Sequence, residues 1–250
     1  MPAETMSRSR RVAAAVVAAL AAVFWGFFWF GLIDLLVVVV QDEEFHQDYL
    51  LESGWGLLYL VLFAVPLVLL AFRPGRSVAL AQLAVVTMAV LAGAAWAGAL
   101  PQLWNGLGLA LTVGLLAALG RWRGLRPRRP DVVLAALAAV ALPAAIAYAE
   151  PLARNATVTE DITNGVSHWP MQASLALAVL GLAGLAAVTR GRLPAWTAAF
   201  TAVWLGVESI VYPDLHGSLG TVGGALAALW GVLVVVGVEL ARRREPAQPG

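Results

Sequence analysis

Histidine and carboxylate side chains are the groups of this chain that could bind a metal ion or transfer protons. Asp214 lies two residues before His216, and His168 occupies a similar place in an earlier loop. Imidazole and carboxylate suit Zn²⁺, Cu²⁺ or Fe²⁺, and three protein ligands with an open position are typical of catalytic metal sites. The ligand spacings of known zinc motifs, such as H-E-x-x-H, are missing. A divalent transition-metal site formed by His168, His216 and His46 is therefore a hypothesis, and histidines that only form hydrogen bonds at helix ends are the alternative.

Two further carboxylates, Asp34 and Glu208, lie inside long apolar segments. Trp204, Glu208 and Tyr212 follow one another at intervals of four residues, which places them on one face of a helix. An ionised group inside a membrane span costs a few kcal/mol, so Asp34 and Glu208 are candidates for ligand binding or proton coupling. The alternative for both is a carboxylate that is hydrated near the membrane surface or hydrogen-bonded to a neighbouring helix.

The elements that must position these groups are apolar. Hydrophobic residues make up 61% of the 250 residues, and charged residues only 12%. A soluble domain has about a quarter charged residues, so this chain cannot cover itself with a polar surface and must be solvated by lipid. Cysteine is absent, which excludes disulfides, thiolate metal sites and cysteine nucleophiles. No motif indicates binding of nucleic acid, phosphate or a dinucleotide.

Eight apolar segments have close to the ~20 residues that a helix needs to cross a bilayer. The backbone must pair its polar groups within each segment, and the alternation typical of barrel strands is missing. We therefore predict an all-α integral membrane protein with eight transmembrane helices. The segments are Val12–Val40, Trp55–Phe72, Val78–Leu100, Leu103–Leu119, Val132–Ala149, Gln172–Val188, Ala195–Tyr212 and Leu219–Ala241.

The charges are sorted between the two sides of the predicted bundle. Fifteen of the sixteen arginines precede the first segment or follow every second one, and Arg154 is the exception. By the positive-inside rule both termini are cytoplasmic. All three histidines and eleven of the fifteen acidic residues then lie outside or in the outer leaflet. Lysine is absent and alanine, leucine and arginine are abundant, which is typical of a GC-rich bacterial genome and indicates the plasma membrane.

The two halves of the chain, 1–125 and 126–250, resemble each other. Both contain the pattern P-x-L-x-x-x-L-G, at 101–108 and at 213–220. The longer outer loops end in Ser53-Gly54-Trp55 and in Ser167-His168-Trp169. These matches favour two parallel four-helix repeats related by an axis along the membrane normal, although chance similarity between apolar sequences is the alternative.

The acidic stretch Asp42–Glu52 follows the first segment. It could attract cations or a basic partner. A solvated connector on the outer side is the simpler interpretation, and we expect that role.

We expect an outward-facing pocket between the repeats, lined by Asp34, Glu208, Asp214, His168 and His216. The leading hypothesis is binding or translocation of a cation or small polar solute, with Glu208 or Asp34 as the protonatable group. A second is a membrane-embedded, metal-dependent enzyme acting on an extracytoplasmic or lipid-linked substrate. A third is a non-catalytic subunit that docks another membrane protein. The sequence leaves open whether the protein is an enzyme, and the lipid bilayer is its expected surrounding.

Overall fold

The structure is a computed structural model that describes residues 7–120, 122, 124–125, 129–155 and 162–244. Arg121, Arg123, Arg126 and Arg128 of the predicted inner linker lie outside the described residues, as do Glu160 and Asp161 of the predicted outer loop.

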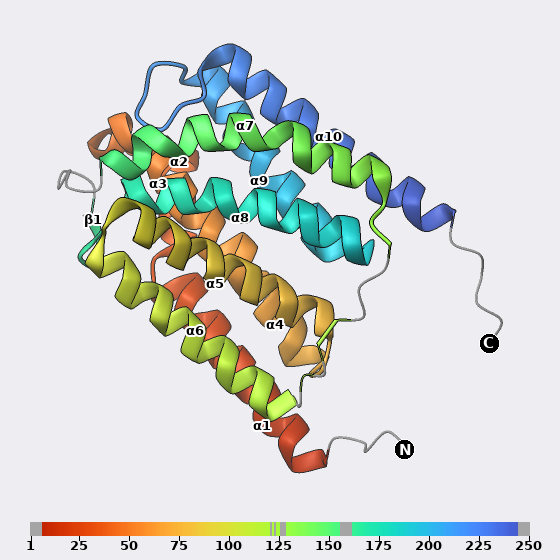
Figure 1. Cartoon of the computed structure of the whole chain (residues 1–250). Helices are drawn as coiled ribbons and strands as arrows, with labels where there is room; N and C mark the ends of the chain where they lie inside the picture. Colours follow the sequence, from red (N-terminus) through yellow and green to blue (C-terminus); the bar gives the residue numbers. More distant parts are fainter. Residues whose placement is uncertain (1–6, 121, 123, 126–128, 156–161, 245–250) are drawn as a thin grey trace.

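The described part of the chain is a bundle of helices with one short hairpin (Figure 1). The longer helices are α1 (Arg8–Val23), α2 (Gly31–Val40), α3 (Tyr49–Gly56), α4 (Val65–Phe72), α5 (Ser77–Ala97), α6 (Leu100–Gly120), α7 (Val132–Arg154), α8 (His168–Thr189), α9 (Arg192–Val211) and α10 (Gly220–Arg243). The π-helical segments η1 (Phe24–Phe28) and η3 (Leu57–Ala64) and the 3₁₀ helix η2 (Glu43–Asp48) connect the first four of them. Strands β1 (Ile162–Thr163) and β2 (Val166–Ser167) pair antiparallel immediately before α8.

Seven helical stretches are long and apolar enough to cross a membrane. They are Arg8–Val40, Glu43–Phe72, Ser77–Ala97, Leu100–Gly120, Val132–Arg154, His168–Thr189 and Gly220–Arg243. The prediction of long apolar helices is thereby confirmed for seven of the eight segments. The remaining one forms α9, a helix of 20 residues in which tryptophan, threonine, proline and glutamate lower the mean hydropathy.

The first two predicted helices are not continuous. The sequence predicted one helix over Val12–Val40, but η1 widens its turns and Phe30 adopts the left-handed conformation (φ 64°) before α2 starts at Gly31. The second stretch contains η3 between α3 and α4. The two distorted segments pack against each other, and π-helical turns occur frequently at functional sites.

A close crossing of α2 and α3 accompanies these distortions. A Cβ atom added to Gly56 would lie 2.5 Å from the Cβ of Leu35 and 2.7 Å from the backbone oxygen of Gly31. Only glycine at position 56 allows the two helices to approach this closely. The crossing brings the side chains at the start of α2 next to those of α3.

Residues from both predicted halves share one apolar core. It includes Leu57 and Phe63 from the first half and Leu182 and Leu205 from the second. The central helix is α8, which packs against α3 and α5 on one side and against α7 and α9 on the other. The start of α1 and the end of α10 lie at the same end of the bundle (Figure 1). The proposed internal duplication remains a prediction.

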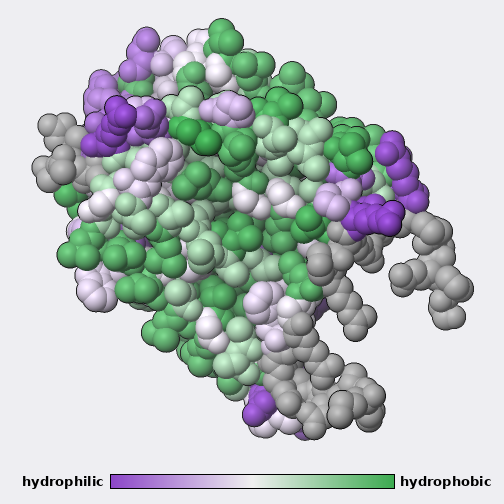
Figure 2. All heavy atoms as spheres, in the orientation of Figure 1, coloured by the Kyte–Doolittle hydropathy of each residue, from purple (hydrophilic) through white to green (hydrophobic). Residues whose placement is uncertain are grey.

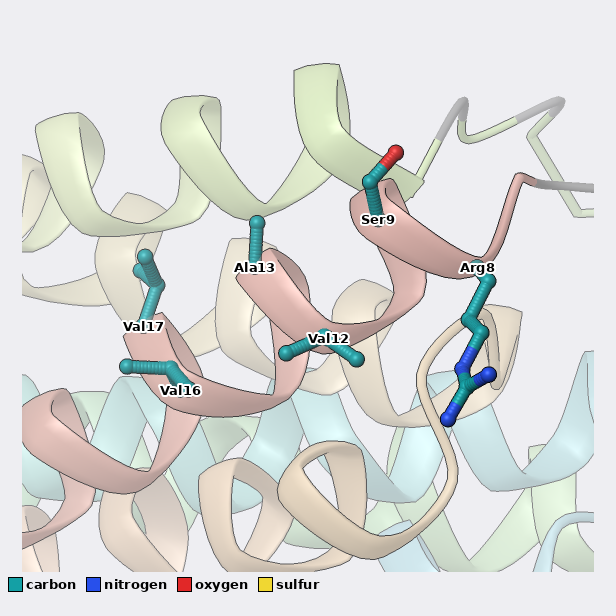
Figure 3. Close-up of a pocket in the computed structure, with 6 residues that line it drawn as sticks. All are labelled: Arg8, Ser9, Val12, Ala13, Val16 and Val17. Carbon is teal, nitrogen blue, oxygen red and sulfur yellow. The ribbon is translucent and has the colours of Figure 1, made fainter.

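The surface between the two ends of the bundle is apolar. Figure 2 shows hydrophobic side chains over the middle of the visible face and hydrophilic ones gathered toward its ends. Leu111 within α6 and Val140 within α7 expose 75% and 76% of their surface. One shallow hollow in this surface runs along α1 from Arg8 past Val12 to Val16 (Figure 3). Exposed side chains of this kind suit contact with lipid.

Candidate functional site

Three buried side chains from three helices form a cluster with the chemistry of a metal site. They are Asp34 of α2, Glu52 of α3 and His168, the first residue of α8. One ligand-type atom from each residue lies within 4.8 Å of those from the other two. His168 Nε2 is 3.8 Å from Asp34 Oδ2, and His168 Nδ1 is 3.8 Å from Glu52 Oε1. Each residue exposes 3% of its surface or less.

The interruption of the first helix positions Asp34. Phe30 is left-handed and its backbone oxygen accepts a hydrogen bond from Asp34 N (2.9 Å), so Asp34 lies in the first turn of the new helix α2. An acidic side chain is favoured there by the helix dipole. In a continuous helix this residue would have no such stabilisation. The sequence singled out Asp34 but gave no sign of the break that accommodates it.

Glu52 is a site residue that the sequence interpretation missed. We expected the acidic stretch to remain a solvated loop as far as Glu52, but α3 begins at Tyr49 and Glu52 is buried in it. The signal that could have revealed this is the apolar run Tyr49–Leu51, which continues the pattern of the following helix toward its N-terminus.

His168 packs against an aromatic group. Its ring lies 4.7 Å from that of Trp55, and the Trp55 indole Nε1 donates to the backbone oxygen of Trp29 at 2.8 Å. The Trp55 ring also contacts Tyr59. Trp55 is itself buried, with 1% of its surface exposed. Its role is to hold the imidazole ring from one side.

Glu208 adjoins the cluster through Ser53, the residue after Glu52. Glu208 Oε1 accepts hydrogen bonds from Ser53 Oγ at 2.6 Å and from Trp204 Nε1 at 2.7 Å. Glu208 is 6% exposed, and its Oε2 has no hydrogen-bond partner among the described residues. Trp204 and Glu208, which the sequence placed on one face of a helix, are therefore in direct contact. The hydrogen bond from Ser53 to Glu208 joins α3 to α9.

The loops that the sequence assigned to the outer side lie next to this region. His216 Nδ1 is 2.8 Å from Asp48 Oδ1, and the backbone N of His216 donates to the oxygen of Gln47 at 3.1 Å. These contacts join the loop after α9 to η2. Asp214 is exposed in the same loop.

Two other residues that the sequence singled out lie in this outer layer. His46 is exposed, and its ring contacts those of Tyr49 and Tyr212. In the part of the chain that the structure describes, neither His46 nor His216 belongs to a group of metal-type ligands. Of the three histidines, His168 alone enters the cluster with Asp34.

A second hydrogen-bond chain borders the cluster. Gln172, one turn after His168 on α8, donates from Nε2 to the Tyr148 hydroxyl at 2.7 Å, and that hydroxyl donates to the oxygen of Gly217 at 2.6 Å. A Cβ atom added to Gly54 would lie 1.5 Å from Gln172 Oε1, so a larger residue at position 54 would displace the amide. The chain joins α7, α8 and the loop before α10.

Two further buried amides link helices outside the cluster. Gln82 Nε2 donates to Thr197 Oγ1 at 3.0 Å, and Gln102 Nε2 donates to Ser174 Oγ and to the backbone oxygen of Pro170 at 3.1 Å. Interhelical hydrogen bonds of this type stabilise helix association in membranes. They tie α5 to α9 and α6 to α8.

The cluster has the composition of a divalent-metal site. Carboxylate oxygens and imidazole nitrogens bind Zn²⁺ at about 2.0–2.2 Å, so ligand atoms on one ion lie roughly 3.3–3.6 Å apart. The separations observed are somewhat longer, and small side-chain rotations would close them. Because His168 faces Asp34 with Nε2 and Glu52 with Nδ1, binding of one ion by all three residues requires the imidazole ring or one of the carboxylates to turn.

Comparison with protein-family models, with curated proteins and with solved structures gives no match to this chain, so the site has to be interpreted from its own geometry.

Proposed function

We propose that this membrane protein binds a divalent transition-metal cation at Asp34, Glu52 and His168. The observation that carries the proposal is the convergence of these residues, which lie 18 and 116 positions apart in sequence, within 4.8 Å in a buried position. Burial of carboxylates in a low-dielectric interior is costly, and a bound cation offsets that cost. Three protein ligands leave a coordination position for water or a substrate.

The interrupted helices support exchange of the cation rather than permanent storage. Discontinuous membrane helices at an ion site are characteristic of transporters, in which the irregular segments can change conformation. Asp34 follows such an interruption directly, and η3 lies a few residues after Glu52. Binding and translocation of a cation therefore remains the leading function.

We propose further that α9 is an eighth crossing and that the cluster lies toward the outer side. Its 20 residues would span about 30 Å as a helix, the thickness of the hydrocarbon core. With α1 starting and α10 ending at the same end of the bundle, the number of crossings must be even (Figure 1). The positive-inside rule then assigns that end to the cytoplasm.

Metal analysis of the purified protein tests the site. After incubation with Zn²⁺ or Mn²⁺ and dialysis, we expect about one ion per chain in the wild type, measured by inductively coupled plasma mass spectrometry. Glu52→Gln and His168→Gln should each lower the affinity by about 10–100-fold or more, because loss of even an outer-shell partner has an effect of that size. His216→Gln and Asp214→Asn are the controls and should retain the ion. A wild type without bound metal, or equal loss in the controls, would show that the cluster is not a metal site.

A proton relay without a metal is the second candidate. It is favoured by the two ring nitrogens of His168, each of which faces a different carboxylate at 3.8 Å. Glu208 would extend such a relay through Ser53. Proton flux into proteoliposomes in the presence of a strong chelator, abolished by Glu208→Gln, would support the relay. Flux that requires added metal would exclude it.

A further inference from the structure

The second half of the bundle contains an apolar cleft of about 440 Å³ between α7, α8, α9 and α10. Its walls are mostly small or aliphatic residues, among them Ala144, Ala176, Leu205 and Ala227, and Trp230 adds an indole ring. Tyr148 at one end and Thr201 bring hydroxyl groups to the lining. The cleft arises because α7 packs mainly on α8 and α10 mainly on α9, so that α7 and α10 contact each other little.

The cleft opens on the surface that faces lipid. Val140 of α7 and Leu226 and Leu229 of α10 line it, and they expose 76%, 61% and 55% of their surface. These two helices are among the stretches long and apolar enough to cross a membrane. The medium next to the opening is therefore hydrocarbon.

The apolar groups next to the opening are the acyl chains of membrane lipids, because the helices on either side of it are long and apolar enough to cross a membrane. A single acyl chain is narrow and flexible enough to enter between α7 and α10 and to fill the cleft. Apolar cavities hold no water, and an unfilled void would forfeit the contacts of its lining.

We propose that this cleft binds one acyl chain of a membrane phospholipid. The chain enters between α7 and α10 and lies against the small residues of α7 and α8. This site is separate from the metal cluster and does not depend on it. Its nearest link to the cluster is Tyr148, whose hydroxyl accepts the hydrogen bond from Gln172.

Photo-crosslinking tests the proposal. The full-length protein is reconstituted in phosphatidylcholine vesicles containing phosphatidylglycerol with a diazirine in one acyl chain, and crosslinked positions are mapped by mass spectrometry. We expect crosslinks concentrated on the cleft-lining residues of α7 to α10. Ala144→Phe combined with Ala227→Phe fills the cleft and should abolish them.

The control is Ala147→Phe, because Ala147 is exposed on the same helix three residues from Ala144 but does not line the cleft. This variant should keep the crosslinks in the cleft. If the filled variant does not elute as a single species, Ala141→Leu narrows the cleft with less added volume and should reduce them. Labelling of the lining no stronger than that of other exposed helix faces, or labelling unchanged in a folded variant with the filled cleft, would overturn the proposal. Metal binding is unaffected by either result, so the two sites are tested independently.

Discussion

At the scale of single residues, the cluster depends on neighbours that fix its side chains. Trp55 holds one face of the His168 ring, and the Glu52–Ser53 pair connects the cluster to Glu208. Gln172 lies one turn after His168, where its amide is fixed by Tyr148 and packed against Gly54. Each of the contacts with Ser53, Trp55 and Gln172 joins different helices, so a substitution at one of these residues should change the stability of the protein measurably.

Gly54→Ala should destabilise the protein by about 2 kcal/mol. The new Cβ atom would lie 1.5 Å from Gln172 Oε1, so the amide must move and its hydrogen bond to Tyr148 is lost. Thermal unfolding in detergent measures the effect. In a Gln172→Ala background the same substitution should cost less than about 0.5 kcal/mol, because the obstructing amide is gone. Gly184→Ala on α8 is the matched control, since nothing lies within 4 Å of the added atom. Equal effects of Gly54→Ala in both backgrounds would show that Gln172 is not the cause.

At the scale of elements, the site is made by irregularities in helices. In a continuous first helix Asp34 would lie in the helix interior, where every backbone N–H group is already used in an intrahelical hydrogen bond. The break at Phe30 starts a new helix and puts Asp34 in its first turn. The close crossing at Gly56 then brings α2 against α3, so that Asp34 and Glu52 approach the same end of α8.

At position 30, glycine should give a more stable protein than alanine by about 1 kcal/mol. Both substitutions remove the aromatic side chain, but a left-handed conformation costs an L-residue roughly 1–2 kcal/mol and glycine is free of that cost. If the first span were instead a regular helix, glycine would be less stable than alanine by about the same amount, so the sign of the difference decides between the two. At the exposed position 28, before the break, glycine should be the less stable of the two. Unfolding of the Phe30→Gly, Phe30→Ala, Phe28→Gly and Phe28→Ala variants in detergent micelles by denaturant gives the comparison.

At the scale of the whole molecule, the two halves enclose one core and α8 lies at its centre. The residues that the sequence assigned to the outer side gather at one end of the bundle, and the start of α1 and end of α10 lie at the other (Figure 1). The positive-inside rule predicts the membrane orientation of this arrangement from the distribution of arginine. Because the chain contains no cysteine, a single cysteine introduced at a chosen position can report on which side of the membrane that position lies.

Single cysteines on either side of α9 should react from opposite sides of the membrane. We expect Asp214→Cys to react with a membrane-impermeant maleimide in intact cells, and Arg192→Cys to react only after permeabilisation. Both residues are exposed, so poor reactivity would not be due to burial. Labelling of both from the same side would show that α9 does not cross, and would place the two termini on opposite sides.

The sequence by itself determined the class of protein and the placement of its long helices. The apolar content and segment lengths were sufficient because lipid requires each span to satisfy its own backbone hydrogen bonds. Hydropathy is additive along the chain, so seven stretches were recognised, six of them with errors of at most five residues at their ends. The second stretch begins at Glu43, twelve residues before the predicted Trp55. The sequence also indicated Asp34, Glu208 and His168, since charged or imidazole groups are rare in such segments.

The tertiary structure alone decided which of these groups meet. The sequence offered His168 and His216 as the stronger ligand candidates and His46 as the weaker one, yet only His168 is carried into the interior, by the start of α8. Glu52 appeared to belong to a solvated loop until α3 was seen to begin before it. The break at Phe30 and the crossing at Gly56 leave no periodic signal, because each depends on contacts with another helix. A pattern along one chain reports how each helix faces lipid, whereas convergence on a site depends on the packing of several helices at once.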